Sequence, residues 1–151
     1  MNARVELSPL PWSPEAEQSV LGAVLIAPDA LLVLAERRLQ AAHFFDARNR
    51  DIWSAVEGMA AARQPVDVVT VFERLQSLGR AETCGGLAYL NGLAECVTSA
   101  ANVARHADIV IGKATRRAIV EAAGRVHDMA NEPGDEDAVL DRVLSLFGGI
   151  Q

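Results

Sequence analysis

The stretch from Ala100 to about Met129 limits most strongly what this chain can fold into. It contains no proline, and Ser99 in front of it is a good helix cap. An unbroken helix of these 30 residues is about 45 Å long, which exceeds the core of a small domain. The helix must therefore find packing partners outside the core next to it.

A second helix follows at once and supplies one such partner. The segment Asn131–Asp135 contains Pro133 and Gly134, and Asp135 can cap a helix whose apolar residues recur up to Phe147. Two helices joined by so tight a turn predict an antiparallel hairpin. We expect its packing or self-association to depend on five apolar residues: Ile119, Val126, Val139, Val143 and Leu146.

The segment Ser13–Ile26 predicts a capped core helix. Ser13 precedes Pro14, and Glu15 and Glu17 lie at the positive end of the helix dipole. Apolar residues at helical spacing give it one buried face. Gly22 inside this helix favours a close approach of another helix there.

Further helices are predicted up to about residue 98. Pro28 opens one, Asp46 caps another, and Gly85-Gly86 begins a short one. The segment Val66–Phe72 has the propensity of a strand, but the Asp67 cap and helical spacing favour a helix. With 26 alanines, the sequence predicts an all-α fold. We expect an extended arm at 1–12, a globular bundle at 13–98 and a projecting hairpin at 99–148.

No constellation of residues predicts catalysis, a metal site or a cofactor site. Glu15 and Glu17, two residues apart on a helix, point in different directions and are better explained as charges at a helix start than as a hydrolase pair. The three histidines are scattered. Gly112-Lys113-Ala114 is not a phosphate loop, because that motif needs Ser or Thr at residue 114 and Gly at residue 107, and both are alanine.

Composition indicates the compartment and the kind of partner. The net charge of −6 favours protein partners over nucleic acid. Cys84 and Cys96 form no closely spaced pair, and neither a signal peptide nor an apolar run of membrane-spanning length is present. We therefore expect a cytoplasmic protein with free thiols and no membrane association.

Three side chains are candidates for contact with a partner: Trp12, Arg116 and Arg117. Trp12 precedes the first cap, so it either staples against the first helical turn or remains an exposed anchor. An alternative function, single-stranded nucleic-acid binding, would use the basic edge formed by Arg105, Lys113, Arg116 and Arg117.

Five ordered segments resemble the N-terminal domain of DnaB-type bacterial replicative DNA helicases. They cover roughly residues 10–147 and are Pro14–Leu25, His43-Phe44-Phe45, Pro65–Leu75, Gly85–Leu90 and Ser99–Val103. Two positions depart from the family pattern. Asn49 replaces a common His, and His106 replaces a common Tyr.

The resemblance implies a non-catalytic collar domain of a hexameric helicase. In this family the hairpins pair to form a trimer of dimers, and the domain docks primase and sometimes a helicase loader. ATP and Mg²⁺ would be bound only by a RecA-like ATPase domain, which is absent from this chain. DNA contact by the collar domain alone is not expected.

Overall fold

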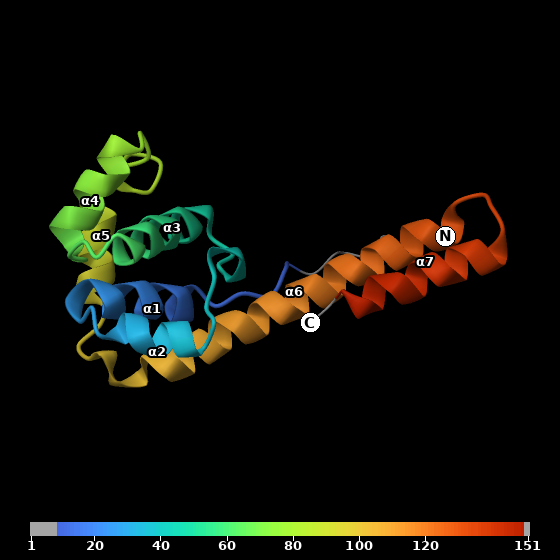
Figure 1. The fold of residues 1–151 in the computed structure, drawn as a ribbon, viewed down its shortest axis with the longest axis horizontal. Helices are drawn as coiled ribbons and strands as arrows, with labels where there is room; N and C mark the ends of the chain where they lie inside the picture. Colours follow the sequence, from blue (N-terminus) through green and yellow to red (C-terminus); the bar gives the residue numbers. More distant parts are fainter. Residues whose placement is uncertain (1–8, 150–151) are drawn as a thin grey trace. The chain divides into compact units, whose positions relative to one another are not determined.

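The computed structural model describes residues 9–149, which fall into two compact units (Figure 1). The globular unit is Trp12–Ala114, and the hairpin unit comprises the described residues up to Pro11 together with those from Thr115 onward. All regular secondary structure between residues 9 and 149 is helical, which confirms the predicted all-α fold class. The α-helices are α1 (Pro14–Ile26), α2 (Ala30–Glu36), α3 (Ala47–Ala61), α4 (Val68–Ser77), α5 (Gly86–Glu95), α6 (Val103–Asn131) and α7 (Glu136–Gly148), with 3₁₀ turns at Ala41–His43 and Ala100–Asn102.

Helix α1 is the centre of the globular unit and packs against α3 and α5 (Figure 1). Its residues Val20, Leu21 and Val24 are completely or almost completely buried. Side chains from the surrounding helices and loops, Phe44, Ile52 and Leu90 among them, complete the core. The predicted amphipathic pattern of Ser13–Ile26 therefore produces this buried face, because apolar area removed from water is the main stabilising term.

At Gly22, α1 lies very close to the backbone of α5. A Cβ atom at this position would overlap the carbonyl oxygen of Leu93 and lie 2.7 Å from Cγ2 of Val97. The close approach expected from the sequence is therefore present. It explains a glycine in a helix interior, where glycine costs about 0.5–1 kcal/mol relative to alanine.

The predicted helix caps are largely confirmed. Ser13, Asp46, Asp67 and Asp135 each accept a hydrogen bond from a backbone amide in the first turn of the helix they precede. The segment after Pro65 is helix α4, not a strand, and Thr70 completes a capping box with Asp67. Ser99, however, caps the 3₁₀ turn Ala100–Asn102, and α6 begins only at Val103.

Helices α3 and α4 end in the same hydrogen-bond pattern but with different residues. Gly79 has a φ of +69° after α4, and Arg63 has a φ of +56° in the equivalent position after α3. In each case the next amide donates to a carbonyl five residues back, Arg80 N to Leu75 O and Gln64 N to Met59 O. Glycine adopts this left-handed conformation without the strain that arginine bears.

We expect Arg63→Gly to raise the free energy of unfolding by about 0.5–1 kcal/mol, because the side chain at residue 63 is exposed and glycine relieves the strain. Thermal denaturation followed by circular dichroism measures the change. Gly79→Ala is the reciprocal control and should lower the melting temperature. An unchanged or lower melting temperature for Arg63→Gly contradicts the expectation.

The boundary between the two compact units falls at Ala114, whereas the sequence analysis places it at residue 98. The first turns of α6 belong to the globular unit because Val103, Ala107 and Val110 are buried in its core. An ion pair between Arg37 Nη1 and Asp108 Oδ2, at 2.6 Å, joins the end of α2 to the same part of α6.

In the hairpin unit, α6 from Thr115 onward and α7 lie side by side and antiparallel (Figure 1). Ala122 is buried and Val126 and Met129 are half-buried on α6, as are Val139, Val143 and Leu146 on α7. These residues recur at spacings of three and four, so each set lies on one face of its helix. Across residues 9–149, no helix is long and apolar enough to cross a membrane.

Candidate interaction surface

A buried carboxylate, that of Glu17, joins α1 to the start of α3. Its Oε1 accepts a hydrogen bond from Phe45 N at 2.6 Å, and its Oε2 accepts one from Asp46 N at 3.3 Å. These amides precede α3, where the helix dipole favours an anion. Glu17 lies in the first turn of α1, as predicted, but its carboxylate accepts hydrogen bonds from the amides before α3, which the sequence did not predict. Its side chain faces inward and caps a neighbouring helix.

Asn49 and Tyr89 extend this buried cluster to α5. Asn49 Nδ2 donates to Glu17 Oε2 at 2.9 Å, and the Tyr89 hydroxyl donates to Asn49 Oδ1 at 2.6 Å. Burial raises the pKa of Tyr89 above its ordinary value. Because Glu17 accepts from three N–H groups, its carboxylate holds α1, α3 and α5 together.

Arg48 covers the outer side of this cluster. Its guanidinium carbon lies 4.3 Å from the centroid of the Tyr89 ring, and its Nη2 is 2.8 Å from Asp46 Oδ2. The hydrogen bond from Arg48 holds the pKa of Asp46 below its ordinary value. A carboxyl group whose pKa is lower in the folded protein than in the unfolded chain stabilises the fold at a pH above the unfolded-chain pKa. This stabilisation is lost as the pH falls through the pKa of the folded protein.

As the pH falls from about 6 to 3, through the ordinary titration range of aspartate, the free energy of unfolding should fall. We expect the fall to be larger in the unaltered chain than in Arg48→Met, because the variant lacks the hydrogen bond that lowers the pKa of Asp46. Melting temperatures of both proteins across this range test the expectation. Arg105→Met removes an exposed arginine of the globular unit and serves as the control. Parallel losses in the unaltered chain and Arg48→Met would show that the ion pair does not set the pH dependence.

The remaining reactive side chains form no cluster. Burial raises the pKa of both thiols, Cys84 in the core and Cys96 near the end of α5, so neither is activated. His43 Nδ1 accepts from Gln40 N and thereby caps a 3₁₀ turn. Among the described residues, no three His, Cys, Asp or Glu side chains are grouped as metal ligands.

Large apolar side chains remain exposed on one side of the hairpin unit. Leu140, Leu144 and Phe147 on α7 each follow a half-buried residue by one position and are therefore turned about 100° away from α6. Ile119 and Val120 on α6 are exposed as well. The exposed residues of each helix are turned in the same sense from the residues that face the other helix. Because the two helices are antiparallel, the exposed residues of α6 and those of α7 therefore lie on the same side of the hairpin. We call this the apolar face: Ile119, Val120, Ala123, Ala130, Leu140, Leu144 and Phe147.

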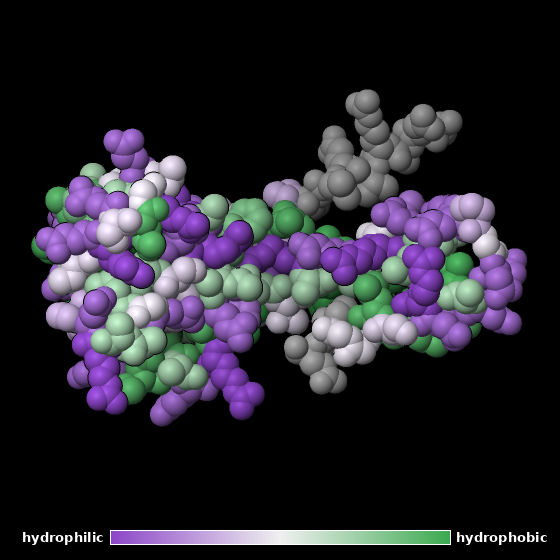
Figure 2. All heavy atoms as spheres, turned by 45° about the horizontal axis from the view of Figure 1, so that its top comes forward, coloured by the Kyte–Doolittle hydropathy of each residue, from purple (hydrophilic) through white to green (hydrophobic). Residues whose placement is uncertain are grey.

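Of the five residues predicted to serve packing or self-association, four lie between the helices and one lies on the apolar face. Val126, Val139, Val143 and Leu146 are half-buried, whereas Ile119 is 52% exposed. The sequence analysis did not single out Leu140, Leu144 and Phe147 as a surface. The width of the apolar stripe on α7 could have indicated this surface, because the stripe is broader than one neighbouring helix can cover. Figure 2 shows hydrophobic side chains reaching the surface of the hairpin.

Charge is distributed unevenly along the hairpin. Residues 127–142, around the turn, contain six carboxylates and one arginine, whereas residues 115–126 contain three arginines and one glutamate. Arg116 and Glu136 mark the two ends of the apolar face, and no ion pair within residues 9–149 uses either of them. The turn end of the face is therefore acidic and the opposite end is basic.

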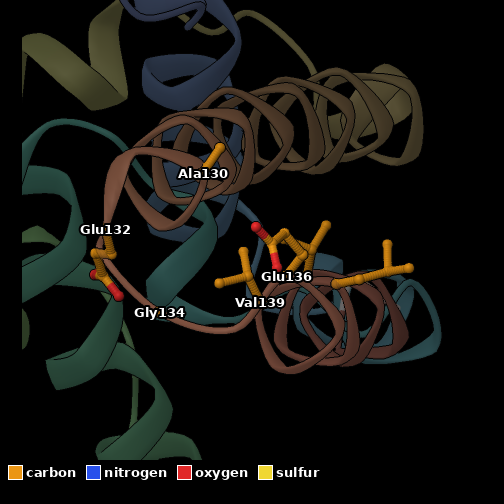
Figure 3. Close-up of a pocket in the computed structure, with 7 residues that line it drawn as sticks. Ala130, Glu132, Gly134, Glu136 and Val139 are labelled. Carbon is orange, nitrogen blue, oxygen red and sulfur yellow. The ribbon is translucent and has the colours of Figure 1, made fainter.

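A pocket of about 350 Å³ opens at the turn end of the hairpin (Figure 3). Its apolar lining comes from both helices and its carboxylates belong to Glu132 and Glu136. Arg142 Nη1 engages Glu132 at 2.8 Å. Its volume lies at the lower end of the range of ligand pockets, about 300–1,000 Å³. It is lined by Ala130, Glu132, Gly134, Glu136, Val139, Leu140 and Val143.

The three predicted partner-facing side chains have different environments. Arg116 is exposed. Arg117 is only 8% exposed and donates from Nη1 to Pro11 O at 2.9 Å, which corrects the expectation for this residue, because its guanidinium is engaged by the chain itself. Trp12 is half-buried, with its ring centroid 5.0 Å from that of Phe45. It packs on the loop before α3 and is not an open anchor.

Comparison with known proteins assigns the family. Residues 9–112 match the DnaB-like helicase N terminal domain. The chain is 39% identical over 132 residues to the replicative DNA helicase DnaB of Geobacillus stearothermophilus, and 38% identical over 111 residues to that of Mycobacterium leprae. These matches cover 87% and 74% of this chain, but only 29% and 18% of the relatives.

Solved structures agree with the sequence matches. The crystal structure of the N-terminal domain of DnaB helicase from Mycobacterium tuberculosis superposes with a TM-score of 0.85 and 34% identity, over 90% of this chain and 96% of that one. A DnaB-like replicative helicase, solved in a study of its interactions with primase, shares the fold with a TM-score of 0.76 and 23% identity, over 92% of this chain and 32% of that one. The chain spans less than a third of its matched full-length relatives and belongs to the DnaB-like helicase N-terminal domain family.

Proposed function

We propose that this chain is the collar domain of a replicative DNA helicase, self-associating through its hairpin and docking primase, with no catalysis of its own. The helicase activity belongs to the remainder of the parent protein, where ATP and Mg²⁺ act. The observation that carries the proposal is the apolar face of the hairpin unit. Five of its large side chains are exposed by about half or more: Ile119, Val120, Leu140, Leu144 and Phe147.

Self-association accounts for this face better than a solitary hairpin does. Single exposed apolar residues are normal on a monomer, but a continuous row over two helices is typical of an interface. A two-fold dimer uses the same patch on both copies and removes both from water. Three such dimers give the six-fold stoichiometry expected of a hexameric helicase.

We expect Leu144→Glu to weaken self-association at least about tenfold, because it places a charge in the middle of the apolar face. Sedimentation equilibrium at micromolar concentration measures the change. Ser145→Glu introduces the same charge one position later, about 100° away from the face, and should leave association nearly intact. A strictly monomeric unaltered chain contradicts the proposal of self-association.

Docking of primase is the second part of the proposed function. Its support is the family membership and the related helicase studied with primase, which shares this fold. Isothermal titration of the chain with the helicase-binding domain of its cognate primase tests it, with binding as the expected result. A helicase loader is the other candidate partner and is tested in the same way. If no heat of binding to primase is measured at concentrations where the chain is dimeric, the proposal of primase docking is wrong. The proposal of self-association is not affected by that result.

The competing function is binding of single-stranded nucleic acid by the basic edge. The burial of Arg117 argues against it, because one of the four positive side chains is already engaged by Pro11. Fluorescence anisotropy with labelled single-stranded DNA at low salt should show no binding. Affinity that falls steeply as salt is added would favour the competing function.

A further inference from the structure

The chain passes from one compact unit to the other at two points, and one hydrogen bond ties these points together. The first lies between Pro11 and Trp12, and the second lies within α6, between Ala114 and Thr115. Arg117, within one helical turn of the second point, donates from Nη1 to the carbonyl oxygen of Pro11 at 2.9 Å. A side chain that follows one crossing therefore holds the backbone at the other.

The two residues Pro11 and Trp12, which we call the strap, are each anchored. The Pro11 carbonyl is held by Arg117, which is only 8% exposed, and a hydrogen bond from a charged donor is stronger where little water competes. The Trp12 ring packs on Phe45, with 5.0 Å between the ring centroids. Because the two anchored residues are adjacent in the chain, the strap can absorb little movement of Arg117.

Residues 112–116 are the part of α6 that burial supports least. Val110 is buried in the globular core and Arg117 is buried in the hairpin unit, but no side chain from 112 to 116 is buried. Gly112 weakens the helix further, because glycine is a poor helix former. A Cβ at Gly112 would meet nothing within 4 Å, so close packing, which explains Gly22, does not explain this glycine. Helical segments with few buried contacts open locally most readily.

We infer that the strap restrains local opening of α6 at residues 112–116, so that Trp12, which is not part of α6, controls the stability of its middle turns. Opening of these turns displaces Arg117 from the start of α6. The hydrogen bond to Pro11 must then break, unless Trp12 leaves Phe45 at the same time. The restraint operates within one chain and does not depend on self-association. A protein partner that drew Trp12 away from Phe45 would loosen α6 without binding to it.

Hydrogen exchange of the 151-residue chain, followed by mass spectrometry, measures the opening of the amides of residues 113–119. We expect Arg117→Met to accelerate their exchange about tenfold, because the hydrogen bond to Pro11 is lost. Trp12→Ala should accelerate the same amides by a similar factor, although its ring packs on Phe45, in the loop before α3. The double variant should exchange no faster than the faster single variant, because both substitutions release the same strap.

Two control substitutions separate the strap from a general loss of stability. Arg116→Met removes an exposed arginine from the neighbouring position on α6, and Phe72→Ala removes a half-buried aromatic ring from α4. Both should leave exchange at residues 113–119 within about twofold of the unaltered chain, because local opening does not follow global stability. Gly112→Ala should slow this exchange about threefold, because alanine is the better helix former.

The combination of variants also decides against the strap if it is wrong. Additive acceleration in the double variant would show that Arg117 and Trp12 act independently, and a Trp12→Ala variant whose exchange changes only around Phe45 would overturn the inference. If Arg117→Met does not fold, Arg117→Lys takes its place. It keeps the positive charge and a donor, so it should accelerate exchange less than Trp12→Ala does.

Discussion

Replacing Glu17 with alanine is expected to lower the free energy of unfolding by about 3 kcal/mol, one of the two largest effects expected of a single substitution in this domain. The Glu17 carboxylate accepts from Phe45 N, Asp46 N and Asn49 Nδ2 in a site where it is 2% exposed. Each buried donor left without an acceptor costs about 1–3 kcal/mol, partly recovered where water enters. Urea denaturation followed by circular dichroism measures the loss.

Glu15→Ala is the matched control for Glu17→Ala. Glu15 lies in the same first turn of α1, carries the same charge near the same helix dipole, and is exposed. Its removal should cost about 0.3–1 kcal/mol. Equal losses in the two variants would show that Glu17 acts only as a charge at the start of α1. Glu17→Gln should retain part of the stability, because one amide oxygen remains as an acceptor.

Gly22→Ala is expected to destabilise the globular unit by about 2–3 kcal/mol, although alanine is the better helix former. The added methyl group overlaps the Leu93 carbonyl oxygen, which belongs to the backbone of α5 and has no other rotamer to adopt. The two helices must then separate, and the core residues between them lose contacts. Thermal and urea denaturation both report the change.

Gly58→Ala controls for the intrinsic effect of the same substitution. Gly58 is an exposed interior residue of α3, and a Cβ there meets nothing within 4 Å. This variant should be about 0.5–1 kcal/mol more stable than the unaltered chain. The two glycine substitutions are thus expected to have opposite signs. A stabilised Gly22→Ala variant would show that α1 and α5 do not approach as closely as the structure places them.

Asn49, which the resemblance gave as a departure from the family pattern, has a defined role in this structure. The side-chain amide donates to Glu17 and accepts from Tyr89 at the same time. A neutral histidine also has one donor and one acceptor, so the two residue types can make the same two hydrogen bonds. With this donor and this acceptor, Asn49 links Glu17 of α1 to Tyr89 of α5.

The sequence by itself determined the helices and their local ends. The signals that mark a helix act over a few residues, so they can be recognised without knowledge of the fold. They are caps such as Asp46 and Asp67, the glycine Gly79 with its positive φ, and the spacing of apolar residues in each segment. The same local signals placed the turn at Pro133-Gly134 and predicted a hairpin. They also indicated that Gly22 needs a close neighbour, but not which one.

Only the tertiary structure decided which residues meet across the chain. Glu17 reaches amides 28 and 29 residues away, and Arg117 reaches the carbonyl of Pro11, 106 residues away. Neither pairing leaves a periodic trace in the sequence, because a hydrogen bond depends on where two elements pack and not on the spacing within one of them. The apolar face likewise emerged only when α6 and α7 had covered each other's inner rows, which left Leu140, Leu144 and Phe147 outside.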